Sequence, residues 1–124
     1  LQDGEIYWID DGYESVPKKI GAVKMDGTEA RIVLKNDLNN LGAIFYHSSS
    51  KRIFFSDIGR KKIESVSIDT IADRQVIISD AEGPLALDIW HIQDSSTGTV
   101  SNSILYYTDQ TQETLVAFNL KVLS

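Results

Sequence analysis

Hydrophobic and polar residues form short runs along this chain, and turn residues separate the runs. Each run holds four to eight residues rich in Ile, Val, Leu, Tyr and Phe, and Gly, Asp, Asn or Ser stands at its borders. Short runs of this composition between turn residues are typical of β-strands. The pattern therefore predicts an all-β chain of many short strands.

One motif occurs three times: two aromatic residues, then a small or aliphatic residue, then an aspartate. The copies are Tyr7-Trp8-Ile9-Asp10, Phe54-Phe55-Ser56-Asp57 and Tyr106-Tyr107-Thr108-Asp109. They start at residues 7, 54 and 106, so the spacings are 47 and 52 residues. Such a period is typical of propeller blades rather than of helical solenoids.

The residues around the motif repeat as well. A strand-like segment follows each copy, at residues 20–27, 63–70 and 115–120. Further runs agree between copies, 31–34 with 74–78 and 41–46 with 84–89. Each full unit therefore holds four strands, as a β-propeller blade does. We assign blade a to 1–36, blade b to 37–80 and blade c to 81–124.

The hairpin after the first motif is longer than its counterparts. The following strand starts 13 residues after Tyr7, but 9 residues after Phe54 and Tyr106. Residues 13–19, around Pro17, carry the extra length. This insertion predicts a longer loop in blade a.

These repeats resemble the YWTD, or class B, repeats of the low-density lipoprotein receptor family and of the epidermal growth factor precursor. The resemblance rests on the three motifs, on the strand and turn at Ile20 to Gly27, and on the Pro-x-Ala-x-Asp strand at Pro84 to Asp88. It covers nearly the whole chain. One departure is that Phe45 occupies the place that Asp88 has in the next blade.

Propellers of this family close with six four-stranded antiparallel blades, so the resemblance implies part of a six-bladed β-propeller. About two and a half blades are present, from the second strand of one blade to the third strand of another. Such an open piece exposes blade faces and strand edges. Either residues outside this chain or further chains complete the ring.

Charge and cysteine content limit the classes of partner. The chain has 18 Asp and Glu against 12 Lys and Arg, a net charge of −6, and no basic stripe. This balance argues against nucleic acid and anionic membrane surfaces as partners. The chain has no cysteine, so the sequence does not report the redox compartment. In the family that the chain resembles, neighbouring EGF-like modules hold the disulfides.

The repeated aspartates have a chemical and a structural interpretation. Carboxylates serve in acid-base catalysis and in metal binding. Asp10, Asp57 and Asp109, however, are one position repeated in three blades, which separates them in space. We expect each to accept backbone hydrogen bonds at a strand end. We predict no catalytic residue, no metal site and no cofactor.

The aromatic pairs are predicted to be packing residues. Adjacent residues of a strand point to opposite faces of the sheet, so each pair supplies apolar bulk to both faces of its blade. The pairs are Tyr7 with Trp8, Phe54 with Phe55, and Tyr106 with Tyr107.

Three residues are candidates for a ligand-binding or pH-sensing surface: His47, Trp90 and His91. Histidine titrates in the endosomal range, and the resemblance implies acid-dependent ligand release, although an ordinary turn or surface histidine is the favoured interpretation. Trp is common at binding hot spots, yet Trp90 equally fits a gap between blades. The run Arg60-Lys61-Lys62 predicts a solvated hairpin turn.

Two classes of function remain, with a third ranked behind them. The first is a non-catalytic ligand-binding or module-docking part of an endocytic or signalling receptor at the cell surface, attached to the membrane only through a segment outside this chain. Its partners are a protein ligand and the neighbouring EGF-like modules. The second is an extracellular-matrix or adhesion propeller resembling nidogen. The third is a propeller hydrolase, which needs polar residues converging on the central channel.

Overall fold

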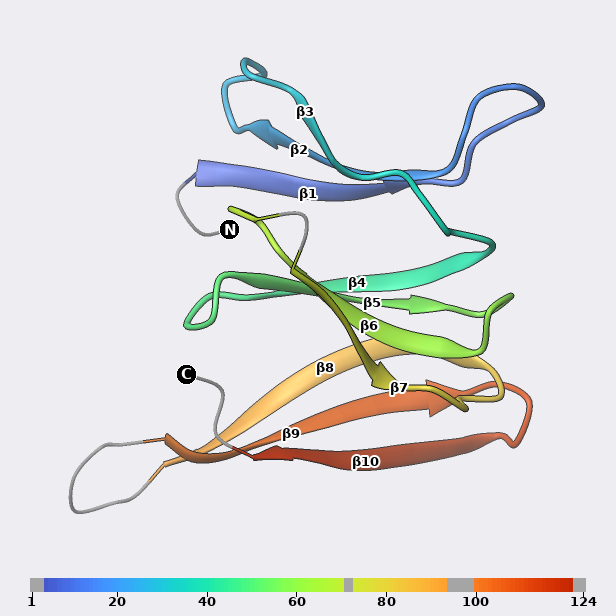
Figure 1. The fold of residues 1–124 in the computed structure, drawn as a ribbon. Helices are drawn as coiled ribbons and strands as arrows, with labels where there is room; N and C mark the ends of the chain where they lie inside the picture. Colours follow the sequence, from blue (N-terminus) through green and yellow to red (C-terminus); the bar gives the residue numbers. More distant parts are fainter. Residues whose placement is uncertain (1–3, 71–72, 94–99, 122–124) are drawn as a thin grey trace.

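The computed structural model of this chain describes residues 4–70, 73–93 and 100–121, and within them ten strands form three antiparallel sheets stacked face to face (Figure 1). The first sheet has the order β1-β2-β3. Its strands are β1 (Glu5–Asp10), β2 (Lys19–Lys24) and β3 (Arg31–Leu34).

The middle sheet is the largest of the three and has the order β4-β5-β6-β7. Its strands are β4 (Leu41–His47), β5 (Arg52–Asp57), β6 (Lys62–Ser67) and β7 (Arg74–Ile78). The last sheet has the order β10-β9-β8, with strands β8 (Pro84–Gln93), β9 (Val100–Asp109) and β10 (Thr114–Lys121).

Each sheet is an antiparallel meander in which strands adjacent in sequence pair with each other. The middle sheet is a complete four-stranded blade. The first sheet holds the counterparts of β5 to β7, and the last holds those of β4 to β6. The prediction of an all-β chain that forms part of a β-propeller is therefore confirmed. The blade boundaries at residues 36 and 80 stay a prediction.

The three motifs occupy the same place in the three sheets, at the end of β1, β5 and β9. Their second aromatic residues face equivalent partners across the pairing strands. These pairs are Trp8 with Gly21, Phe55 with Glu64, and Tyr107 with Val116. The repeat in the sequence is therefore a repeat of strand register.

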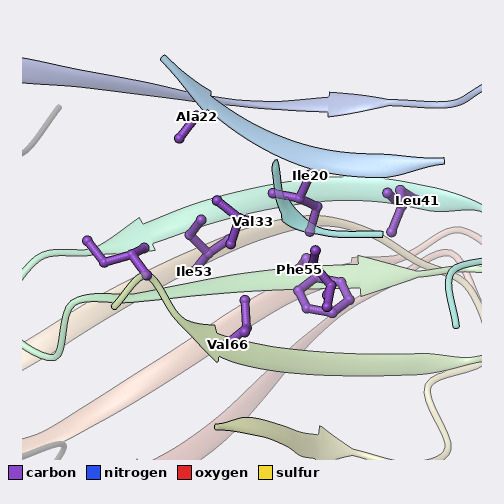
Figure 2. Close-up of a cluster of buried hydrophobic side chains, with 9 residues drawn as sticks. Ile20, Ala22, Val33, Leu41, Ile53, Phe55 and Val66 are labelled. Atoms are coloured by element: carbon purple, nitrogen blue, oxygen red, sulfur yellow. The ribbon is translucent and has the colours of Figure 1, made fainter. Parts of the chain in front are cut away.

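Two clusters of buried apolar side chains hold the sheets together. The first interblade cluster lies between the β1–β3 and β4–β7 sheets, and Figure 2 shows it as sticks. Its buried residues are Ile20, Ala22, Val33, Leu34, Leu41, Ile53, Phe55, Val66 and Ile68. The second interblade cluster lies between the β4–β7 and β8–β10 sheets. Its buried residues are Phe54, Ile63, Ala81, Ile89, Leu105 and Tyr107.

The adjacent residues Phe54 and Phe55 explain how one strand serves both clusters. Phe55 belongs to the first cluster and Phe54 to the second, and both side chains are fully buried. Successive strand residues point to opposite faces of a sheet. Burying a side chain of this size contributes about 1.5–3 kcal/mol. The aromatic pair of β5 thus packs the middle sheet against both of its neighbours.

Candidate binding surfaces

Asp57 is fully buried at the end of β5, where its carboxylate accepts three backbone hydrogen bonds. The N–H groups of Asn39 and Asn40 donate to it at 2.8 and 2.9 Å, and that of Arg60 donates at 3.2 Å. Asn39 and Asn40 belong to the connection between the first two sheets. Asp57 therefore fixes this connection to the β5–β6 hairpin, and the three N–H groups satisfy its own buried carboxylate.

The other two motif aspartates bind backbone groups of their own hairpins. Asp109 accepts hydrogen bonds from the N–H groups of Thr111 and Gln112 at 3.0 and 3.1 Å. Asp10 accepts one from the N–H of Gly12 at 2.9 Å and forms an ion pair with Lys19 at 3.1 Å. The Gly12 hydrogen bond, then Lys19, lowers the pKa of Asp10. The three carboxylates lie one in each sheet, and the described part of the chain holds no group of three or more His, Cys, Asp or Glu that could bind a metal ion.

A buried ion cluster centres on Glu64, in the middle of β6. Arg60 Nη1 lies 2.6 Å from the carboxylate, and Nε and Nη2 of Arg74 lie 2.9 Å from its two oxygens. Arg74 Nη1 donates to the carbonyl of Asn36 at 2.7 Å, and Arg60 Nη1 to that of Asp37 at 2.8 Å. The cluster therefore fixes the same sheet-to-sheet connection that Asp57 binds.

The charge state of Glu64 follows from two opposing effects. Burial raises the pKa of its carboxyl group, but the hydrogen bonds and charges of Arg74 and Arg60 outweigh burial, and the pKa lies below the ordinary value of 4.5. Glu64 is therefore ionised at neutral pH. Two guanidinium groups make charge-assisted hydrogen bonds to it.

The prediction of a solvated basic turn is wrong for Arg60, because its guanidinium binds Glu64 and the Asp37 carbonyl. The sequence holds a signal for this cluster, since Glu64 is a charged residue within the strand segment Ile63 to Val66, which is buried throughout. A buried carboxylate needs a charged or hydrogen-bonding partner. Glu64 and Arg74 are on different strands, so the sequence does not identify Arg74 as the partner of Glu64 until β6 is known to pair with β7.

His47 lies inside the fold rather than on its surface. Its side chain is buried, its Nδ1 lies 2.6 Å from Ser50 Oγ, and its ring meets the edge of the Phe54 ring at a centroid distance of 6.1 Å. Phe54 belongs to the second interblade cluster. His47 thus stands beside the contact between the middle and last sheets.

Trp90 lies on β8 and is exposed. The side chain of His91 lies outside the described residues, so the structure gives no placement for this candidate. The structure therefore does not bring His47 and Trp90 together: one is interior to the stack of sheets and the other is on its outer face.

The loop between β1 and β2 presents an aromatic residue that was not among the sequence candidates. Tyr13 and Val16 exchange backbone hydrogen bonds of 3.1 and 2.8 Å, and both side chains are exposed. Lys18 Nζ donates to the carbonyl of Asp11 at 2.8 Å across the base of the loop. The extra length of the loop was the sequence signal for this feature. The hairpins after β5 and β9 are shorter and have no such loop.

The described residues enclose no pocket, and their exposed large hydrophobic side chains lie on loops and strands. No helix among the described residues is long and apolar enough to cross a membrane. The chemistry that these surfaces offer is contact through exposed aromatic, aliphatic and charged side chains, as in protein–protein recognition.

Comparisons with known proteins extend the interpretation of the fold. No protein-family model matches the chain. Nidogen of Drosophila melanogaster is 32% identical over 77 residues, which are 62% of this chain and 5% of that protein. A chain in a crystal structure of a nidogen/laminin complex is 25% identical, with a TM-score of 0.73. That match covers 94% of this chain and 39% of the other chain.

Both likenesses are consistent with YWTD-type repeats and with a partial β-propeller. Both relatives named here are connected with nidogen. This chain spans about a twentieth of the length of its sequence relative and less than half of the chain in the matched structure.

Proposed function

We propose that this chain is part of a non-catalytic, protein-binding β-propeller in an extracellular-matrix or adhesion protein. The observation that carries the proposal is the match over 94% of the chain to a structure of a nidogen/laminin complex. The sequence likeness to a nidogen, found independently of the fold comparison, supports it. By analogy with that complex, the partner is an extracellular protein of the laminin kind.

The matrix interpretation replaces the receptor interpretation as the leading one. At least one aromatic residue of each motif packs in an interblade cluster, so the motif does not distinguish a receptor propeller from a matrix propeller; these residues are Tyr7, Phe54, Phe55 and Tyr107. Fold alone does not fix function. The two comparisons supply what the motif lacks, because both favour nidogen. Extracellular localisation is part of the same proposal.

The loop of residues 11–18 is the contact surface that we favour for a protein partner. Tyr13 is 76% exposed on a loop held by two backbone hydrogen bonds, so little backbone entropy is lost when a partner binds the loop. Tyrosine supplies a large contact area with a polar tip and is enriched at protein interfaces. Asp11 and Glu14 are exposed beside it, which favours a partner surface with basic groups.

Binding of purified laminin to the immobilised chain tests the proposal, with purified low-density lipoprotein as the comparison ligand. We expect saturable laminin binding that Tyr13→Ala weakens by about tenfold, the effect of losing a modest hot spot. Met25→Ala is the matched control, because Met25 is also exposed but lies in the turn at the opposite end of β2.

Each result of this experiment has a stated meaning. Lipoprotein binding without laminin binding would return the receptor interpretation to first place. Equal laminin binding by wild type and Tyr13→Ala would remove the loop from the contact and leave the matrix interpretation standing.

A further inference from the structure

Tyr13 has the most accessible hydroxyl group of the tyrosines in this chain. The chain has five tyrosines, and all of them belong to the described residues. Tyr13 is 76% exposed, whereas the other four are half-buried or buried: Tyr7, Tyr46, Tyr106 and Tyr107. A side chain must reach solvent before it can enter the active site of a modifying enzyme. The Tyr13 hydroxyl is therefore the candidate acceptor for a transferred group.

The loop of residues 11–18 extends past the ends of β1 and β2, so Tyr13 does not belong to a sheet face (Figure 1). Two backbone hydrogen bonds between Tyr13 and Val16 close a turn, and the exposed residues Glu14 and Ser15 form its tip. Glu14 has a φ of +51°, which is uncommon for a residue other than glycine. The turn is held by two hydrogen bonds at an unfavourable backbone angle, so it can open locally and enter an active-site groove.

Carboxylates flank Tyr13 on both sides. Asp11 precedes it by two residues and Glu14 follows it directly, and both are exposed. Lys18, at the base of the loop, donates to the backbone carbonyl of Asp11 at 2.8 Å rather than to a carboxylate. Opposite charges attract and fix the register of a bound segment. A tyrosine between acidic residues therefore suits an enzyme whose substrate groove is lined with basic side chains.

We propose that Tyr13 is sulfated by a tyrosylprotein sulfotransferase of the secretory pathway. The proposal rests on the extracellular function proposed above, because such an enzyme meets only chains that pass through that pathway. The phenol oxygen of Tyr13 attacks the sulfur atom of a phosphoadenylyl sulfate donor and forms an O–S bond. The bond from that sulfur to the donor's phosphate oxygen breaks, adenosine bisphosphate leaves, and the phenol proton passes to a base of the enzyme. No atom changes its oxidation state.

A sulfate ester at Tyr13 adds a negative charge to the surface that we favour for a protein partner. The ester is a strong acid and stays ionised across the physiological pH range, whereas a phosphate group takes up its second proton at about pH 6. Asp11 and Glu14 lie beside it on the same loop. The modified loop should therefore form stronger, charge-assisted hydrogen bonds with basic side chains of a partner.

Transfer of radiolabelled sulfate in vitro tests the proposal independently of localisation. The purified chain is incubated with a purified tyrosylprotein sulfotransferase and labelled phosphoadenylyl sulfate. We expect one sulfate group per chain, on the peptide that contains Tyr13, and none on Tyr13→Phe. Combined Asp11→Asn and Glu14→Gln substitutions should slow the transfer at least about threefold, since two attractive charges are lost. Combined Asp26→Asn and Glu29→Gln substitutions are the matched control, because they remove the same charge from the exposed turn between β2 and β3.

The possible results either support or overturn sulfation at Tyr13. An unlabelled wild-type chain overturns it, and so does equal labelling of wild type and Tyr13→Phe. Equal slowing by the two double variants would remove the role of the flanking carboxylates. Tyr13→Phe loses only the hydroxyl of an exposed side chain, and far-ultraviolet circular dichroism checks that every variant is folded.

Secretion of the chain from animal cells provides the second measurement. Sulfate found at Tyr13 by accurate mass supports the proposal. Phosphate at this residue, which a phosphatase removes, overturns it, and so does an unmodified hydroxyl.

The laminin assay separates this proposal from the proposed function. Sulfation of a chain that does not bind laminin supports the modification and removes the laminin-type partner. Laminin binding by a chain that is never sulfated supports the partner and removes the modification. When both hold, the sulfated chain should bind laminin more tightly than Tyr13→Phe does, and salt should reduce the difference, because it screens exposed charges.

Discussion

Single carboxylates hold the connection between the first two sheets in place. Asp57 accepts hydrogen bonds from the N–H groups of Asn39 and Asn40, and Glu64 orients Arg74 toward the carbonyl of Asn36. The connecting segment has backbone N–H and C=O groups that water would otherwise satisfy. Here the buried Asp57 carboxylate accepts from two of the N–H groups, and the Arg74 guanidinium held by Glu64 donates to a C=O group. Such charge-assisted hydrogen bonds are stronger than neutral ones.

The ionisation of Glu64 gives a prediction about acid stability. The pKa of its carboxyl group is lowered in the folded chain, so its stabilising contribution is complete above about pH 4.5 and is lost as the pH falls through the lower, folded value. We expect Glu64→Gln to reduce the free energy of unfolding by about 1–3 kcal/mol at pH 7. The deficit should shrink as the pH falls below 4.5, because wild type then loses the same charge.

Urea denaturation of both proteins between pH 7 and pH 3 measures this difference. Asp26→Asn is the control: its carboxylate also has a lowered pKa, but Asp26 is exposed and bonds only within its own turn. A deficit for Glu64→Gln that stays constant with pH would mean that the charge of Glu64 contributes nothing.

At the scale of elements, the β1–β2 hairpin differs from its counterparts by its extended loop. Gly12 has a φ of +72°, and a Cβ atom there would collide with the Val16 carbonyl oxygen and with the backbone of Pro17. Both the positive φ and the lack of room for a Cβ atom therefore disfavour any residue other than glycine at this position.

Gly12→Ala should therefore disrupt the loop without unfolding the sheet. We expect a loss of stability of about 1–2 kcal/mol, since a left-handed conformation is imposed on alanine, and faster amide hydrogen exchange at Tyr13 and Val16. Gly27→Ala is the matched control, because Gly27 also has a positive φ, of +86°, but nothing lies within 4 Å of its Cβ position. Unchanged exchange at Tyr13 and Val16 in Gly12→Ala would contradict this account of the loop.

The same hairpin shows how far a sequence can describe an element. Loop length predicted a longer hairpin after β1, and the loop is there. The hydrogen bonds between Tyr13 and Val16 were not predictable, because they depend on the turn that the backbone takes at Gly12. Spacing fixes how many residues a loop has, whereas its conformation depends on local contacts.

At the scale of the whole molecule, two separate clusters hold three sheets, so the sheets should uncouple one at a time. In a stacked repeat protein each unit contacts only its neighbours. Phe55→Ala removes the centre of the first cluster and Phe54→Ala that of the second. Truncation of a buried Phe costs about 3–5 kcal/mol.

The two tryptophans report the two ends of the molecule separately, Trp8 in β1 and Trp90 in β8. In single-tryptophan backgrounds, Phe55→Ala should lower the urea midpoint seen by Trp8 more than that seen by Trp90, and Phe54→Ala should do the reverse. Equal shifts at both probes in both variants would show that the chain unfolds as one cooperative unit.

The place of His47 shows why a stack of sheets hides information from its sequence. His47 ends β4, Trp90 holds the equivalent place in β8, and both were candidates for a surface. The last sheet stacks on the face of the middle sheet that holds His47 and Phe54, whereas no sheet among the described residues covers Trp90. Burial here is a property of neighbouring sheets and not of local sequence.

The sequence by itself determined the strands, the four-stranded unit and the alternation that sends Phe54 and Phe55 to opposite faces. It could do so because these features follow from spacing within a repeat and from the two-residue period of a strand. Only the tertiary structure decided which faces are covered, how Glu64 meets Arg60 and Arg74, and where the loop of residues 11–18 presents Tyr13. Those features depend on contacts between elements, and such contacts leave no periodic trace in the chain.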